Sequence, residues 1–233
     1  MRLQWDQTGE RQYETGTDHA VLYPLRNNVY DNGVAWNGIT GYTESPGGAE
    51  AQDMFADNIK YASPRSSETY ASTIEAYTYP DEWAECDGSV EVVPGVIAGQ
   101  QKRMPFGLSV RTKIGNDIDD DAGYKLHLQY NSTASPSDRG YSTVNDSPEG
   151  VTFSWETNAT PVPVSALNPK TGEPLRPMAS ITIDSTKTDP AKLKALEDIL
   201  YGTENAAARL PLPDEVFALL ASSSSSNSGN SEG

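Results

Sequence analysis

Four segments of this sequence alternate apolar and polar residues with a period of two, a pattern that few folds accommodate. The segments are residues 106–114, 124–130, 151–156 and 179–184. Successive side chains of a β-strand point to opposite faces of the sheet, so this alternation gives each strand one apolar and one polar face. Repeated strands of this kind are typical of antiparallel sheets that bury one side in the core. The sequence therefore predicts a mainly β fold, an antiparallel β-sandwich or barrel.

Further strands are expected nearer the start of the chain, over residues 20–23, 29–43 and 69–79. Asn27-Asn28 interrupts the first two of these strands, and Asn37-Gly38 is a signal for a type I′ turn. Asn37-Gly38 therefore predicts a β-hairpin. In the strand over 69–79, Glu75 belongs to the polar face.

The helix signals are fewer and lie mainly near the end of the chain. The sequence DPAKLKALEDILYG predicts a helix that Asp189 caps and Gly202 ends, with proline in its first turn. A weaker short helix is expected over 214–220, and another over 80–86, held to the core by Trp83. The predicted architecture is a β-sandwich or barrel with one packed α-helix.

The chain of 233 residues is long enough for one domain of this class. Its predicted parts are a flexible N-terminal arm, a β domain and a disordered serine-rich tail, at 1–18, 19–220 and 221–233. Within the domain, residues 44–68 contain Gly47-Gly48 and two prolines and show little periodicity. We expect a long loop there, and loops beyond about 12–15 residues are usually functional or disordered.

The formal net charge of −16 excludes some classes of partner. Nucleic-acid binding needs a basic surface that displaces counterions from phosphates, and anionic membranes also attract basic surfaces. No run of residues approaches the roughly 20 apolar residues that span a bilayer. The start, MRLQWDQTGE, has no apolar signal-peptide segment, so we expect the protein to stay on the reducing side of a membrane.

Motifs for catalysis and metal binding are missing from the sequence. It contains no phosphate-binding loop, no GxGxxG and no GxSxG. The two histidines, His19 and His127, lie in separate strands, and we expect His127 to form hydrogen bonds in a sheet or interface. The single cysteine, Cys86, allows no disulfide within the chain and is expected to be buried. We predict neither catalytic residues nor a cofactor.

An acidic segment at 115–123, GNDIDDDAG, is the one candidate for a calcium loop. Its aspartates alternate, at Asp117, Asp119 and Asp121. The EF-hand pattern fails because Ala122 stands where glycine is needed and Leu128 where glutamate is needed. A solvated acidic turn is the favoured interpretation, and calcium binding stays open.

Several pieces, in this order and at this spacing, resemble a siphophage major tail protein, the tail tube subunit of long non-contractile phages. They are GVAWNGITG, ADNIKY, TIEAYTYPDEWAECDGS, FGLSVRTKIGND, GYKLHLQYNS and STVNDSPEGVTFSWET. The resemblance extends over about residues 18–185 and is strongest in YTYPDEWAECDG and in FGLSVRT with GYKLHLQYN.

The resemblance implies a β-sandwich of the phage tail tube type that assembles into stacked hexameric rings. The partners it implies are further copies of the chain, the tape measure protein, the tail terminator and tail tip proteins, and tail assembly chaperones. Viral DNA would pass through the lumen without specific binding. The implied location is the virion tail, assembled in the cytoplasm of the bacterial host, with no membrane, catalytic residue or cofactor involved.

The acidic composition agrees with such a conduit, because an acidic wall repels DNA and keeps it moving. We take Glu75 as a lumen-facing candidate. We expect 44–68 to reach a neighbouring subunit, with these candidate contact residues: Glu44, Glu50, Asp53, Phe55, Asp57 and Lys60. The alternatives are another β-rich virion protein, such as a tail terminator or capsid decoration subunit, and more distantly a glycosidase or carbohydrate-binding module.

Overall fold

A computed structural model describes residues 2–141, 143 and 150–221. It contains a nine-stranded sheet with the strand order β2-β1-β10-β11-β12-β7-β4, in which β3 also pairs with β1 and β13 with β11. The strands of this sheet are β1 (Tyr13–Arg26), β2 (Val29–Tyr30), β3 (Val34–Trp36), β4 (Ile39–Gly48), β7 (Glu68–Ala76), β10 (Phe106–Gly115), β11 (Gly123–Ala134), β12 (Phe153–Ala159) and β13 (Ser180–Asp184). Two further hairpins are β5 (Met54–Ala56) with β6 (Ile59–Ala62), and β8 (Val90–Val93) with β9 (Val96–Ala98). The helices are α1 (Trp83–Cys86), α2 (Pro190–Tyr201) and α3 (Pro213–Ala221).

The sheet folds on itself into a β-sandwich with an aromatic core. Side chains of β1, β3 and β10 meet those of β7 and β12, although none of the first three strands pairs with β7 or β12 in the sheet. Trp83 of α1 lies at the centre, with its ring centroid 4.6 Å from that of Trp36 and 5.3 Å from that of Trp155. The predicted antiparallel β-sandwich is therefore confirmed.

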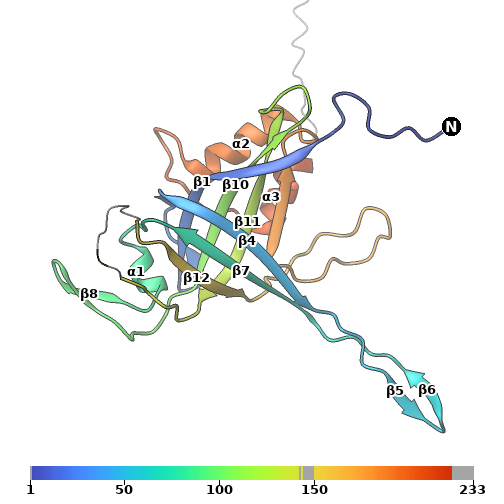
Figure 1. The fold of residues 1–233 in the computed structure, drawn as a ribbon, viewed down its shortest axis with the longest axis horizontal. Helices are drawn as coiled ribbons and strands as arrows, with labels where there is room; N and C mark the ends of the chain where they lie inside the picture. Colours follow the sequence, from blue (N-terminus) through green and yellow to red (C-terminus); the bar gives the residue numbers. More distant parts are fainter. Residues whose placement is uncertain (1, 142, 144–149, 222–233) are drawn as a thin grey trace, which may run out of the picture.

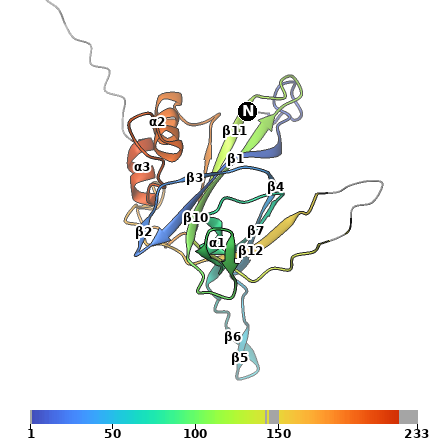
Figure 2. The same cartoon turned by 90° about the vertical axis from the view of Figure 1, so that its left-hand side faces the viewer.

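A second core lies on the outer face of the sheet, beneath the helices (Figure 2). Leu126, Leu128 and Tyr130 alternate along β11 and are fully buried against this layer. They pack with the apolar stripe of α2, whose buried residues are Leu193, Leu196 and Leu200. On the opposite face of β11, Gln129 is 1% exposed, so both faces of the strand are covered at this point, unlike those of a half-buried strand.

The predictions for the helices are confirmed except in number and length. The Asp189 side chain accepts hydrogen bonds from the backbone N–H groups of Ala191 and Lys192, and Gly202 ends α2 with a φ of 79°. Helix α3 covers the expected 214–220 and packs beside α2, so two helices pack on the sheet instead of one. Helix α1 is shorter than predicted.

The hairpin predicted at Asn37-Gly38 is wrong. Strand β3 pairs with β1, whereas β4 pairs with β7, so the chain crosses here between the two halves of the sandwich. Gly38 has a positive φ, but a type I′ turn needs positive φ at both central residues. Asn27 and Asn28 meet that requirement, with φ of 53° and 62°, and close the β1–β2 hairpin. Burial of Trp36 in the aromatic core favours the crossing.

The sheet begins earlier than the sequence suggested. Strand β1 starts at Tyr13, which pairs with Gly115 of β10, so residues 13–18 of the expected arm belong to the sheet. The segment ahead of β1 extends away from the body (Figure 1). Of the expected serine-rich tail, residues 222–233 lie outside the described part of the chain.

Candidate assembly interface

The most prominent feature of the molecule is a long hairpin that projects from the sandwich (Figure 1). It continues the ladder of β4 and β7, whose last pair is Gly48 with Glu68. We define the arm as residues 49–67. Backbone hydrogen bonds from Gln52 to Pro64 and from Ser66 to Glu50 hold its two sides together. The segment is thus a β-hairpin and not the irregular loop expected from its composition.

A two-residue turn closes the tip of the arm. Asp57 and Asn58 have φ of 50° and 62°, the requirement of a type I′ turn, and they join β5 to β6. The Asp-Asn pair is the sequence signal that could have identified this hairpin. A two-stranded hairpin without other support is marginally stable in water, so contact with a partner would stabilise the arm.

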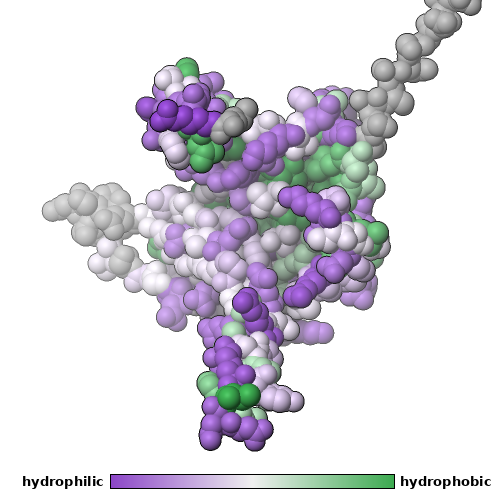
Figure 3. Space-filling view, turned by 90° about the vertical axis from the view of Figure 1, so that its right-hand side faces the viewer, coloured by the Kyte–Doolittle hydropathy of each residue, from purple (hydrophilic) through white to green (hydrophobic). Residues whose placement is uncertain are grey.

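Apolar side chains are exposed on the arm among hydrophilic ones (Figure 3). The exposed large residues are Met54, Phe55, Ile59 and Tyr61. Phe55 has the predicted position on the arm and is 70% exposed. Exposed apolar patches on soluble proteins mark interaction sites, because burying them on a partner removes apolar surface from water.

Two of the charged residues predicted on the arm, Asp53 and Lys60, bond to each other. The Lys60 Nζ lies 2.6 Å from Asp53 Oδ1, which also accepts a hydrogen bond from the Ser63 hydroxyl. These contacts lower the pKa of Asp53. Glu50 contributes its backbone carbonyl to the ladder, and Asp57 occupies the turn. The surface of the arm therefore combines exposed apolar residues with exposed charged ones.

The placement of Glu44 in an inter-subunit loop needs correction. Glu44 lies in β4, inside the body of the sheet, opposite Ser72 of β7. Its Oε1 accepts a hydrogen bond of 2.8 Å from the Tyr70 hydroxyl and lies 3.4 Å from His127 Nδ1. The contact with His127, together with that from Tyr70, lowers the pKa of Glu44 although burial opposes the shift. Glu44 thus makes its contacts within one subunit, in the part of β4 that leads into the arm, which we call the root of the arm.

The buried side of this polar region is a hydrogen-bonded network inside the sandwich. Gln129 of β11, which faces inward opposite Leu108, accepts from Ser72 and donates to Thr157. Ser72 and Thr157 also bond to each other at 2.7 Å. Satisfied networks of this kind fix the relative positions of the strands that contribute to them. The strands joined here are β7, β11 and β12.

The hairpin β8–β9 is a second apolar projection, which the sequence analysis missed. It lies near α1 (Figure 1), and its exposed residues are Val90, Val92, Val93, Val96 and Ile97. The signal was present in VEVVPGVIA, because Pro-Gly is a turn dipeptide between two β-branched runs. Gly95 has the positive φ, 82°, that the second position of such a turn needs.

Glu75 is exposed on β7, as expected for its polar face. It pairs with Gly41 of β4 and Ser154 of β12, so it stands in the outer face of that half of the sandwich. Among the described residues, its carboxylate has no ion-pair partner.

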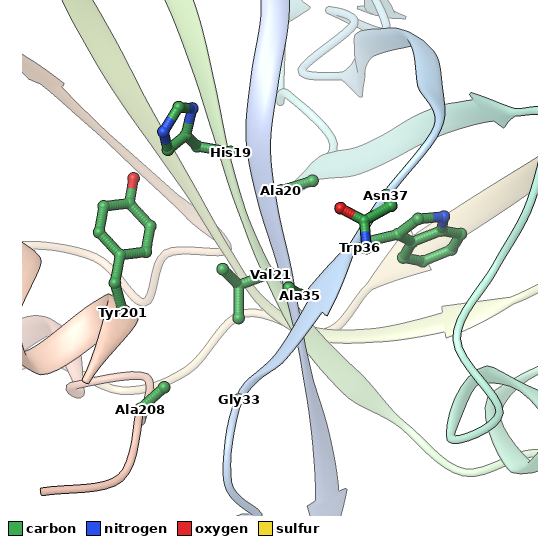
Figure 4. A pocket seen from close by; sticks show the side chains of 9 residues that line it. All are labelled: His19, Ala20, Val21, Gly33, Ala35, Trp36, Asn37, Tyr201 and Ala208. Carbon is green, nitrogen blue, oxygen red and sulfur yellow. The ribbon is translucent and has the colours of Figure 1, made fainter. Parts of the chain in front are cut away.

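A cavity of about 530 Å³ lies between the edge strand β3 and the end of α2 (Figure 4). His19 and Tyr201 are the titratable residues that line it, and their ring centroids are 6.0 Å apart. His19 Nδ1 lies 3.0 Å from the Asp18 carboxylate, and burial raises the pKa of Tyr201. The remaining lining is largely apolar.

The two remaining candidates for a reactive side chain, Cys86 and His127, lie within the packed fold. Cys86 is fully buried, as predicted, and burial raises the pKa of its thiol to about 12. His127 forms the expected hydrogen bond, at 3.0 Å from the Thr112 hydroxyl. Neither side chain is presented to solvent as a nucleophile would be.

The carboxylates of 115–123 do not converge on a common point. Asp117 accepts a hydrogen bond from the backbone of Gly9, and Asp120 accepts one from the Tyr13 hydroxyl. Within 2–141, 143 and 150–221, no group of three or more His, Cys, Asp or Glu residues is placed to hold a metal ion. The acidic turn instead fastens the segment ahead of β1.

In the described part of the chain, no helix has the length and apolar character that crossing a bilayer requires. No family model and no curated protein matches the sequence. One similar solved structure is a chain of the anti-feeding prophage (AFP) baseplate, determined by cryo-EM with 6-fold symmetrisation. The TM-score is 0.34 and the identity 9%, with 71% of this chain and 93% of that chain covered. A similarity of this size carries no argument about function.

Proposed function

We propose that this chain is a structural virion subunit, without enzymatic activity, that assembles into stacked hexameric rings to form a phage tail tube. The observation that carries the proposal is the arm, a regular hairpin that leaves the body and exposes apolar side chains. A subunit that buries this surface against its neighbours gains stability only on assembly. The resemblance of the sequence to siphophage major tail proteins supports the same function.

The arm and the sandwich have complementary roles in this proposal. The sandwich, with its buried aromatic core, is the rigid body of each subunit, and the arm reaches a neighbour in the same ring or in the next ring. Hairpin β8–β9 and the segment ahead of β1, where Leu3 and Trp5 are exposed, are further contact surfaces. The tape measure protein, the terminator, the tip proteins and the assembly chaperones are the proposed partners. The proposed location is the virion tail, assembled in the host cytoplasm.

Electron microscopy of the purified protein tests this function. Negative-stain images of concentrated protein, recorded at low and at high salt, should show hollow tubes of stacked rings. Single closed rings would instead indicate a terminator-like subunit. Protein that stays monomeric even after the tail tip complex is added as a nucleus would contradict the proposal.

We expect added salt to promote assembly. Each subunit has a net charge of −16, so stacking brings like charges together. The screening length falls from about 8 Å at physiological ionic strength to about 3 Å at 1 M, which weakens this repulsion. Light scattering during a titration with sodium chloride measures the effect. Suppression of assembly by salt would show that attractive ion pairs dominate the contacts.

Glu75→Lys should slow genome ejection and leave tube assembly intact, if Glu75 faces the lumen. DNA carries about one negative charge per 1.7 Å of duplex, so a ring of lysines would retain it where a ring of carboxylates repels it. Ejection kinetics of phage that carry the variant measure the effect, and Glu75→Gln, which removes charge without reversing it, should be slowed less. Tails of normal appearance that eject at the wild-type rate would place Glu75 elsewhere.

A further inference from the structure

A compact group of polar side chains lies at the root of the arm, with His127 at its centre. The His127 side chain is only 13% exposed and stands between two carboxylates. Its Nδ1 lies 3.4 Å from Glu44 Oε1 on β4, and its Nε2 lies 3.8 Å from Glu14 Oε1 on β1. Strands β1 and β4 do not pair with each other in the sheet, so His127 of β11 connects them.

The hydrogen bonds around Thr112 determine which nitrogen carries a proton. The Thr112 hydroxyl donates its one hydrogen to Glu14 Oε1 at 2.8 Å. It can therefore only accept from His127 Nε2, 3.0 Å away, so that Nε2 is protonated. Burial raises the pKa of Glu14, but the hydrogen bonds from Lys125 and Thr112 together outweigh it and lower the pKa, which favours the ionised carboxylate.

The remaining nitrogen, Nδ1, faces an atom that only accepts hydrogen bonds. Glu44 Oε1 already receives the Tyr70 hydroxyl, and an ionised carboxylate has no hydrogen to donate. A bare Nδ1 would set its lone pair against this oxygen. The 3.4 Å contact with Glu44 lacks hydrogen-bond geometry, and the buried Nδ1 has no hydrogen-bond partner among the described residues. A proton on Nδ1 turns the same contact into an attraction.

The charges around His127 also favour a doubly protonated imidazole. The titratable side chains that face or adjoin the imidazole are Glu14 of β1, Tyr42 and Glu44 of β4, Tyr70 of β7 and Lys125 of β11. Burial raises the pKa of both tyrosines, which stay neutral. Lys125 Nζ lies 2.7 Å from Glu14 Oε2. Two carboxylates thus face one ammonium group, and a charged imidazole completes the balance that a partly buried ionic group needs.

We infer that His127 is a positioning residue for the arm: its doubly protonated imidazole holds Glu44, at the root of the arm, to β11. This attraction between His127 and Glu44, which we call the hold, is present when the imidazole is charged and the carboxylates are ionised. It is lost as pH rises through the range in which histidines lose their proton. The functional meaning rests on the proposed role of the arm in assembly, but the hold itself is a property of the single subunit.

Nitrogen NMR of the unassembled subunit at low salt tests the protonation. The chain has only two histidines, and His19→Gln assigns the remaining signal to His127. At a pH near 6, both ring nitrogens of His127 should have imidazolium shifts. A neutral His127 ring at a pH where His19 is charged would overturn the inference.

Amide hydrogen exchange of Glu44, Ser45, Gly47 and Gly48 tests whether His127 holds this end of β4 in place. After correction for intrinsic exchange, protection in the wild type should fall by about tenfold as pH rises from about 5.5 to 8.5, the scale of one charged hydrogen bond. His127→Gln, or Glu44→Gln if the first variant folds poorly, should abolish this pH dependence, and His19→Gln should retain it. Protection that ignores pH in the wild type would overturn the inference. This measurement uses the single subunit and does not depend on tube formation. If tubes form but protection does not depend on pH, only this inference is contradicted. If protection depends on pH but no tubes form, only the proposed function is contradicted.

Discussion

Replacing the arm, residues 49–67, by an Asn-Gly turn should give a folded subunit that forms no tubes. The turn joins Gly48 to Glu68, the last pair of the β4–β7 ladder, and Asn-Gly suits a two-residue hairpin connection. The strands of the arm pair with each other and contribute nothing to the two cores. The free energy of unfolding should therefore change little, whereas assembly should be lost. Thermal unfolding and negative-stain microscopy measure the two effects.

A finer variant separates the apolar surface of the arm from its length. Phe55→Ser with Tyr61→Ser keeps the hairpin but removes two exposed rings, and we expect it to reduce assembly strongly. Ile118→Ser is the matched control, because Ile118 is similarly exposed but lies in the acidic turn at 115–123. Tubes of normal yield from the arm replacement would refute the role of the arm, and equal losses from both serine variants would show a general effect of surface hydrophobicity.

Trp83→Ala should destabilise the subunit by about 3–5 kcal/mol, the usual cost of removing a large aromatic side chain from a core. Trp83 is fully buried, and its ring meets those of Trp36, Phe106 and Trp155 at centroid distances of 4.6–5.3 Å. Domains are stable by only about 5–15 kcal/mol, so this change removes a large part of the total. Urea unfolding followed by circular dichroism measures it.

Two controls qualify the effect of Trp83. Trp5→Ala removes the same ring from a position that is 75% exposed, and should change the free energy of unfolding by no more than about 0.5 kcal/mol. Trp83→Phe should cost less than Trp83→Ala, because it keeps an aromatic ring, and the indole N–H has no hydrogen-bond partner within the described residues. A loss below about 1 kcal/mol for Trp83→Ala would mean that the core repacks around the gap.

Elements with a local cause could be predicted from the sequence, often to within a few residues. Helix α2 begins at its capping aspartate and ends at Gly202, because cap, proline and glycine act within one turn of the backbone. The strands β7, β10, β11, β12 and β13 follow from alternation, which needs only the two-residue period of the backbone. The turn at Asn37-Gly38 misled the prediction, because strand pairing depends on distant burial of Trp36 as much as on the turn.

The candidate site was less predictable than the fold. Residues 44–68 were recognised as an unusual segment, but Glu44 belongs to the sheet and only the later residues to the arm. Hairpin β8–β9 was missed although its Pro-Gly turn and β-branched residues were visible, because a short apolar run is more often a core strand than an exposed one.

By itself the sequence determined the class of fold, the capped helix and the acidity of the surface, since these depend on composition and on periods of a few residues. Only the tertiary structure decided that β11 is covered on both faces around Gln129, so that Gln129 forms a buried network with Ser72 and Thr157. It also decided that Glu14, Glu44 and His127, far apart in the chain, meet at the root of the arm. The physical reason is that burial and proton sharing depend on which strands become neighbours. Folding of the sheet onto itself sets those neighbours, and no local pattern in the sequence encodes them.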